Sequence, residues 1–124
     1  MNILLYTNPF LTRNKLDFYS GAINKKLIPQ ALTLLEHNNE VTVFLNRASY
    51  EQINRSHSGD IKFIVVEVTD QFFLENVSKD IEKELYLGNS DYVNKLSEWF
   101  LLKLNGNSFD CVIGWETPIN FIEK

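Results

Sequence analysis

The 124-residue chain is poor in cysteine and histidine, two residue types on which many reactive and metal sites depend. Its one cysteine, Cys111, cannot form an internal disulfide, so we expect a reducing compartment. Cys111 stands inside an apolar run, and we interpret it as a small buried side chain. His37 and His57 lie far apart in polar segments without ligand-type neighbours. The sequence therefore predicts no metal site, and solvated loop histidines are a simpler interpretation than catalytic ones.

Glycine is also sparse, with five residues in the chain. A dinucleotide-binding loop needs closely spaced glycines directly after the first strand, where this chain has Thr7, Asn8, Pro9 and Phe10. No Walker loop and no Gly-x-Ser-x-Gly elbow occurs. The Ser-, Thr- and Gly-rich loop of flavodoxins and the paired acidic residues of phospho-receivers are missing as well. We therefore expect no nicotinamide, flavin or other resident cofactor.

Positive charge is not in excess, since 16 acidic residues outnumber 12 basic ones and give a net charge of -4. Such a balance gives no electrostatic footprint for nucleic acid, so we expect no nucleic-acid partner. No run approaches the roughly 20 apolar residues of a transmembrane helix. The amino terminus lacks the basic start and the cleavage site of a signal peptide. We expect a cytoplasmic protein with, at most, peripheral contact with the inner face of a membrane.

What the chain does contain is a regular alternation of apolar runs and helical patterns. The apolar runs are rich in β-branched and aromatic side chains, and they predict strands over 2–6, 41–45, 63–68 and 109–115. Helical periodicity predicts helices over 20–36, 49–54, 70–88, 90–106 and 119–123. Pro29 should kink or restart the first of these helices, because its ring removes a backbone donor.

Strands that alternate with helices favour parallel pairing through right-handed crossovers. We therefore predict an α/β fold, a Rossmann-like three-layer sandwich with a parallel sheet of about four strands. The expected strand order is 3-2-1-4, with helices on both faces. Residues 1–124 are long enough for a single domain, and 44% apolar content can build its core. Because few residues follow the last strand, we expect this domain to be a piece of a longer protein.

The predicted order brings the carboxyl ends of the first and fourth strands together, where open α/β sheets bind ligands. Glu116 follows the fourth strand and is the best-placed general base, because a desolvated carboxylate can have its pKa raised. Glu116 can equally accept hydrogen bonds from the start of the next helix, and the residues leave both roles open. Glu67 and Asp70 also fall near this rim, although Asp70 fits a helix cap better. Asp110 falls at the opposite end of its strand and is interpreted as structural.

Four segments also follow each other in a familiar order. An opening strand spans 2–6, residues 27–35 contain Pro-x-Ala-x-x-Leu, residues 40–43 are Glu-Val-Thr-Val, and residues 109–113 are Phe-Asp-Cys-Val-Ile. In order and spacing these segments resemble the amino-terminal half of a GT-B glycosyltransferase. The chain departs from that pattern because it lacks a glycine pair after the first strand. It also has Asn38 and Asn39 where Gly-His is usual.

The resemblance implies that the full-length protein moves a sugar from a nucleotide-sugar donor to a glycan or lipid-linked acceptor, with no metal. A carboxyl-terminal half would hold most of the donor and would be this domain's partner, so we expect this chain alone to be inactive. In such a domain the loop after the first strand lines the acceptor side, aromatic rings stack on sugars, and basic residues meet an acceptor phosphate. The substrate-binding residues implied by this resemblance are Asn8, Phe10, Arg13, Asp17, Tyr19, Trp115 and Thr117, with Glu116 as the base.

A second hypothesis needs no catalysis. The predicted helix pair over 70–104 carries more aromatic residues than one buried stripe needs, and such a surplus often marks an interface. We expect this pair to pack against the second half or another partner. The chain can then also be interpreted as a stand-alone Rossmann-like module that binds a small ligand or a protein. Phe18 and Tyr19, in turn, can simply pack over the sheet edge.

Overall fold

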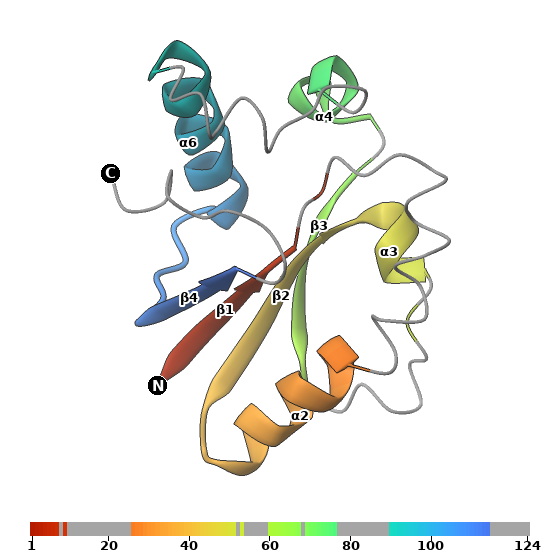
Figure 1. Cartoon of the computed structure of the whole chain (residues 1–124), viewed down its shortest axis with the longest axis vertical. Helices are drawn as coiled ribbons and strands as arrows, with labels where there is room; N and C mark the ends of the chain where they lie inside the picture. The colour runs from red at the N-terminus through yellow and green to blue at the C-terminus, as the bar shows by residue number, and fades with distance from the viewer. Residues whose placement is uncertain are drawn as a thin grey trace.

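The computed structural model describes residues 1–7, 9, 26–51, 53, 60–67, 69–76 and 90–114. Strands and helices alternate along these ranges, and Figure 1 shows their arrangement. The elements are β1 (Asn2–Tyr6), α2 (Ile28–Glu36), β2 (Glu40–Asn46), α3 (Arg47–Glu51), β3 (Lys62–Val66), α4 (Gln71–Asn76), α6 (Ser90–Leu104) and β4 (Cys111–Gly114). Among the described helices, none has both the length and the apolar character needed to cross a membrane. The helix predicted at 119–123 lies outside the described residues.

The strands form one parallel sheet in the order β3-β2-β1-β4, which confirms the predicted fold class and strand order. β1 is central: Ile3 pairs with Val41 of β2 on one side and with Cys111 of β4 on the other. From β1 the chain moves outward to β2 and β3, and then returns across β1 to form β4. This reversal leaves the carboxyl ends of β1 and β4 side by side.

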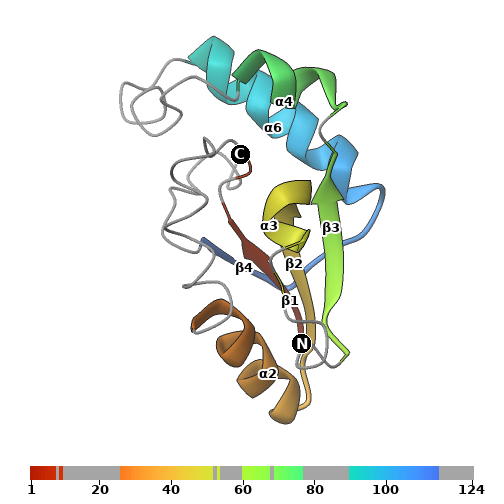
Figure 2. The same ribbon diagram turned by 90° about the vertical axis from the view of Figure 1, so that its right-hand side faces the viewer.

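Both faces of the sheet are covered, and Figure 2 shows α2 on one side of the strands with α4 and α6 on the other. Alternate side chains of a strand point to opposite faces. Ile3 and Leu5 of β1 pack in the cluster that contains Ala31 of α2, whereas Leu4 and Tyr6 pack in the cluster that contains α6. Because β1 is buried on both faces, its sequence is a continuous apolar run rather than an alternating one.

α6 supplies much of the core on its side of the sheet. Its buried side chains recur at helical spacing, as the sequence predicts, at Val93, Leu96, Trp99, Phe100 and Leu104. The rings of Trp99 and Phe100 lie with their centroids 5.9 and 5.1 Å from that of Phe44 in β2. Aromatic contacts at such distances stabilise a core beyond the area that they bury. They fix α6 against the middle of the sheet.

α2 begins and ends at residues suited to those positions. Pro29 lies in its first turn, where the missing N–H has no intrahelical partner to lose. After the helix, Asn38 has a φ of 65° and donates its N–H to the Leu35 carbonyl over 3.1 Å. Asparagine tolerates this left-handed conformation better than most residues, so Asn38 serves where glycine usually ends a helix. The part of the predicted helix before residue 26 lies outside the described residues.

Several boundaries differ from the sequence prediction. α3 begins at Arg47, two residues before the predicted helix at 49–54, and β4 is described over Cys111–Gly114 rather than 109–115. Cys111 is half-buried at the edge of the α2-side core instead of fully buried. Asp110 accepts a hydrogen bond from the Asn2 N–H over 2.8 Å, which confirms its structural role at the amino edge of the sheet.

Candidate functional site

The carboxyl rim between β1 and β4 is the geometric centre of the candidate site. Tyr6, the last residue of β1, pairs with Gly114, the last residue of β4. The segments that follow these two strands therefore start from neighbouring positions on one edge of the sheet. Ligands of open α/β sheets bind in the crevice at such a reversal of strand order.

The predicted substrate-binding residues and the predicted base Glu116 all lie outside the residues that the structure describes. Their roles therefore stay predictions, and only the strand ends from which their segments start are observed. These residues are Asn8, Phe10, Arg13, Asp17, Tyr19, Trp115, Glu116 and Thr117.

Thr7, the first residue after β1, is hydrogen-bonded to the neighbouring strand β2. Its Oγ1 donates to the Phe44 carbonyl over 2.7 Å, and its N–H donates to the same oxygen over 3.0 Å. The side chain is buried. Because a buried hydroxyl that is hydrogen-bonded to backbone is costly to redirect, Thr7 holds β1 to β2 and is not a ligand group.

Asn46, at the end of β2, is a rim residue that the sequence analysis missed. Its Oδ1 accepts the Ser49 N–H over 2.7 Å, and its Nδ2 donates to the Pro9 carbonyl over 3.0 Å. The first bond caps α3 and explains why this helix starts at Arg47, and the second holds the chain beyond β1. An asparagine directly before a helical segment is a known cap signal, so the cap was readable from the sequence. The hydrogen bond to Pro9 could not be predicted in this way, because the two residues are 37 positions apart in the sequence.

Glu67 follows β3 and is paired with Arg47 from the start of α3. The Arg47 Nε donates to Glu67 Oε2 over 3.1 Å, and Nη2 forms an ion pair with Oε1. The hydrogen bond from Arg47 lowers the pKa of Glu67 and outweighs the opposing effect of burial. The Arg47 guanidinium carbon also lies 5.2 Å from the centroid of the Tyr50 ring. A carboxylate with a lowered pKa is a poor general base, so the rim role predicted for Glu67 is not favoured.

Asp70 precedes α4 and makes three interactions through one carboxylate. Oδ1 accepts the Phe73 N–H over 3.0 Å and the Trp99 Nε1–H over 2.9 Å, and Oδ2 forms an ion pair with Lys103. The first bond confirms the predicted helix cap. Burial raises the pKa of Asp70, but the hydrogen bonds from Lys103, Phe73 and Trp99 outweigh it and lower the pKa below its ordinary value. Asp70 is therefore a structural anion that ties α4 to α6.

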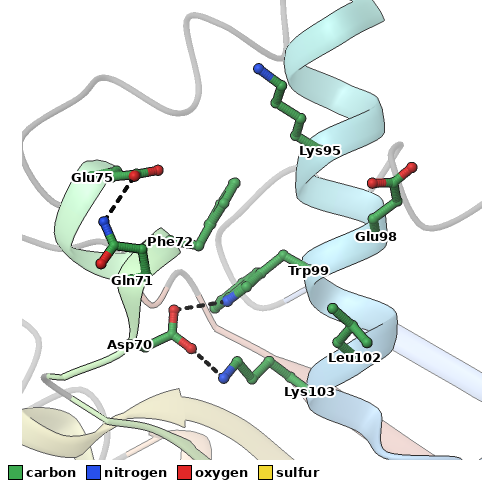
Figure 3. A pocket seen from close by; sticks show the side chains of 9 residues that line it. All are labelled: Asp70, Gln71, Phe72, Glu75, Lys95, Glu98, Trp99, Leu102 and Lys103. Atoms are coloured by element: carbon green, nitrogen blue, oxygen red, sulfur yellow. Dashed lines mark hydrogen bonds and ion pairs between the residues drawn. The ribbon is translucent and has the colours of Figure 1, made fainter.

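A groove of about 560 Å³ lies between α4 and α6, beside this carboxylate. Phe72 of α4 points between the two helices and stacks on Trp99, with ring centroids 5.1 Å apart and planes at 20° (Figure 3). The polar part of the lining carries both signs of charge, from Asp70, Glu75 and Glu98 and from Lys95 and Lys103. A groove of this volume is within the usual range for small-ligand sites.

Metal ligands do not gather anywhere in the part of the chain that is described: no three His, Cys, Asp or Glu side chains there are close enough to hold an ion. Comparison of the chain with protein-family models, with curated proteins and with solved structures gave no match. The geometry of the rim and of the groove is therefore the basis for the functional proposal.

Proposed function

We propose that this chain is the amino-terminal, acceptor-side domain of a GT-B glycosyltransferase. The complete enzyme would move a sugar from a nucleotide-sugar donor to a glycan or lipid-linked acceptor. The observation that carries the proposal is the pairing of Tyr6 with Gly114, which joins the carboxyl ends of β1 and β4 where the strand order reverses. The segments 8–19 and 115–117, which hold every predicted site residue, follow these two strand ends.

The assignment of the base rests on elimination among carboxylates. Glu67 is held by Arg47, and Asp70 is held by Lys103 and Trp99, and the pKa of each carboxylate is lowered. Neither is suited to accept a proton near neutral pH. Of the three carboxylates considered for this role, Glu116 is the one that we propose as the general base.

The chemistry of the rim segments supports a sugar acceptor. Phe10, Tyr19 and Trp115 offer aromatic rings that can stack on sugar faces, and Arg13 offers a guanidinium for an acceptor phosphate. A lipid-linked acceptor would bring the domain to the inner face of a membrane, so we propose a cytoplasmic protein in peripheral contact with it. A second α/β half would supply the donor site.

Nuclear magnetic resonance can test the location of the acceptor site with the chain as it is. The probes are a short-chain prenyl phosphate, chitobiose and UDP-glucose, each titrated into isotope-labelled protein. We expect the prenyl phosphate or the disaccharide to shift the amide signals of Thr7 and Gly114, and to leave Lys62 at the far end of β3 unchanged. UDP-glucose should have little effect, because the proposal assigns the donor site to a second half. Binding of UDP-glucose alone at the rim, or no binding of either acceptor probe, would contradict the proposal.

The groove between α4 and α6 favours the alternative function, a binding module without catalysis. The same titrations distinguish this module from the acceptor-side domain. A ligand that shifts Gln71 and Lys95 but leaves Thr7 and Gly114 unchanged would place binding in the groove. That outcome would support the module and remove the argument for an acceptor site at the rim.

Glu116→Gln tests the catalytic role in the protein that contains both halves. Loss of a general base commonly costs a factor of about 10²–10⁴, so we expect kcat to fall at least about 100-fold with a small change in KM. Glu36→Gln is the matched control, because Glu36 is an exposed carboxylate at the end of α2, just before β2 begins at Glu40 and thus away from the carboxyl ends of the strands. Activity of Glu116→Gln within a few-fold of the wild type would refute the assignment.

A further inference from the structure

One line of side chains on the solvent side of α6 is exposed along most of the helix. Asp91, Lys95, Glu98 and Leu102 follow at spacings of four, three and four residues, which place them above one another on one helix face. Leu102 is 77% exposed and the adjacent Leu101 is 63% exposed. Lys95, Glu98 and Leu102 also form the α6 wall of the groove, so α4 does not cover them (Figure 3).

The charges on this line have no partner within the described chain. The ion pairs there join Arg47 to Glu67 and Lys103 to Asp70, and none involves Lys95 or Glu98. Two exposed leucines and two opposite charges without an ion-pair partner in the described residues therefore lie together on one open face of α6.

The charges of the α6 line are complementary to those of a second, antiparallel copy of the same line. If two α6 helices lie antiparallel and cross at the level of residues 96 and 97, Lys95 of each comes level with Glu98 of the other. Asp91 of each then comes near the level of Leu102 and Lys103 of the other. A two-fold axis requires this reciprocity, in which residue i contacts residue j and j contacts i.

We propose that the protein forms a two-fold symmetric dimer through this α6 line, packed antiparallel against the α6 line of a second copy. Two Lys95–Glu98 pairs at the centre set the register, and Leu101 and Leu102 contribute apolar area on either side. α6 has 15 residues and is about 22 Å long. Because exposed ion pairs are individually weak and this area is modest, the dimer belongs to the weak, reversible class. The surface is separate from the β1–β4 rim, so this inference does not depend on the proposed glycosyltransferase function.

Charge reversal with sedimentation equilibrium tests both the dimer and its register. In the Lys95→Glu dimer, the two Lys95–Glu98 pairs become two pairs of facing carboxylates. In the Glu98→Lys dimer, they become two pairs of facing ammonium groups. We expect either single reversal to weaken the dimer by about tenfold in Kd at low salt. The double variant Lys95→Glu/Glu98→Lys restores both pairs and should dimerise like the wild type. Lys62→Glu is the control, because Lys62 is exposed on β3, outside the α6 line, and gives the same change in net charge as Lys95→Glu.

Leu102→Ser gives a second, uncharged test, since Leu102 is exposed and its replacement leaves the core intact. We expect a weaker dimer with an unchanged circular dichroism spectrum. A monomer at every protein concentration would overturn the proposal, and so would a dimer that neither charge reversal weakens. If both single reversals weaken the dimer and the double variant does not restore it, the antiparallel register is wrong.

Discussion

Asp70→Ala removes the contact that holds α4 against α6, and its cost can be worked out from the three interactions of the carboxylate. Loss of the cap on the Phe73 N–H costs about 1 kcal/mol. The buried Trp99 side chain also loses Asp70 as the acceptor of its Nε1–H, which costs about 1–3 kcal/mol. The Lys103 side chain is 33% exposed, so loss of its ion pair adds little. We expect the free energy of unfolding to fall by about 2–4 kcal/mol.

Urea denaturation followed by tryptophan fluorescence measures this loss. Asp70→Asn separates the ion pair from the other two bonds, because the asparagine carbonyl can still accept from Phe73 and Trp99 but the amide cannot pair with Lys103. We expect this variant to lose about 1 kcal/mol or less. Asp60→Ala, at an exposed position, is the control and should stay within about 0.5 kcal/mol of the wild type. An Asp70→Ala protein as stable as this control would refute the reasoning.

The pH dependence gives the same prediction an independent check. Burial raises the pKa of Asp70, but the hydrogen bonds from Lys103, Phe73 and Trp99 hold it below the ordinary value of 3.8. A carboxylate with a lowered folded-state pKa stabilises fully above its unfolded pKa and loses this effect as pH falls through the folded value. The stability difference between wild type and Asp70→Asn should therefore be constant near neutral pH and shrink below about pH 4. A difference that grows in acid would contradict the assignment.

Two further substitutions test the helix ends. Asn46→Ala removes the cap of α3 and the bond to the Pro9 carbonyl, so we expect a loss of about 1–3 kcal/mol in urea denaturation, with Asn46→Asp partly retaining the cap. Alanine tolerates a φ of 65° less well than asparagine does, so Asn38→Ala at the end of α2 should lower the free energy of unfolding by about 1 kcal/mol. Asn38→Gly should be neutral or stabilising, because glycine adopts this conformation without steric cost. Equal stability of the Ala and Gly variants at 38 would show that the left-handed conformation carries no cost.

The strands and their order could be predicted because their signals are local. β1 and β2 are continuous apolar runs, and the helices between strands leave parallel pairing as the consistent arrangement. α6 was equally predictable, since its buried positions repeat at helical spacing over 15 residues. α3 starts two residues before the predicted helix because Asn46 caps it, and asparagine before a helix is itself a local signal.

The roles of the rim side chains could not be predicted in the same way. Glu67 and Asp70 were grouped with Glu116 by their position after strands, but their partners Arg47 and Trp99 are 20 and 29 residues away in the sequence. A carboxylate titrates according to the donors and the burial around it, and neither is visible from its neighbours in the chain. Only the folded arrangement shows that both are held as anions.

By itself, the sequence determined the four strands and α6, because apolar runs and helical periodicity act over a few positions. It also determined the α/β class and the strand order, because right-handed crossovers between parallel strands leave few arrangements. The tertiary structure decided which polar groups near the rim are already occupied, which helix faces stay open to solvent, and where a groove forms between α4 and α6. These properties depend on contacts between residues brought together from distant parts of the chain. Hydrogen bonding, pKa and exposure are therefore set only when the helices have packed on the sheet.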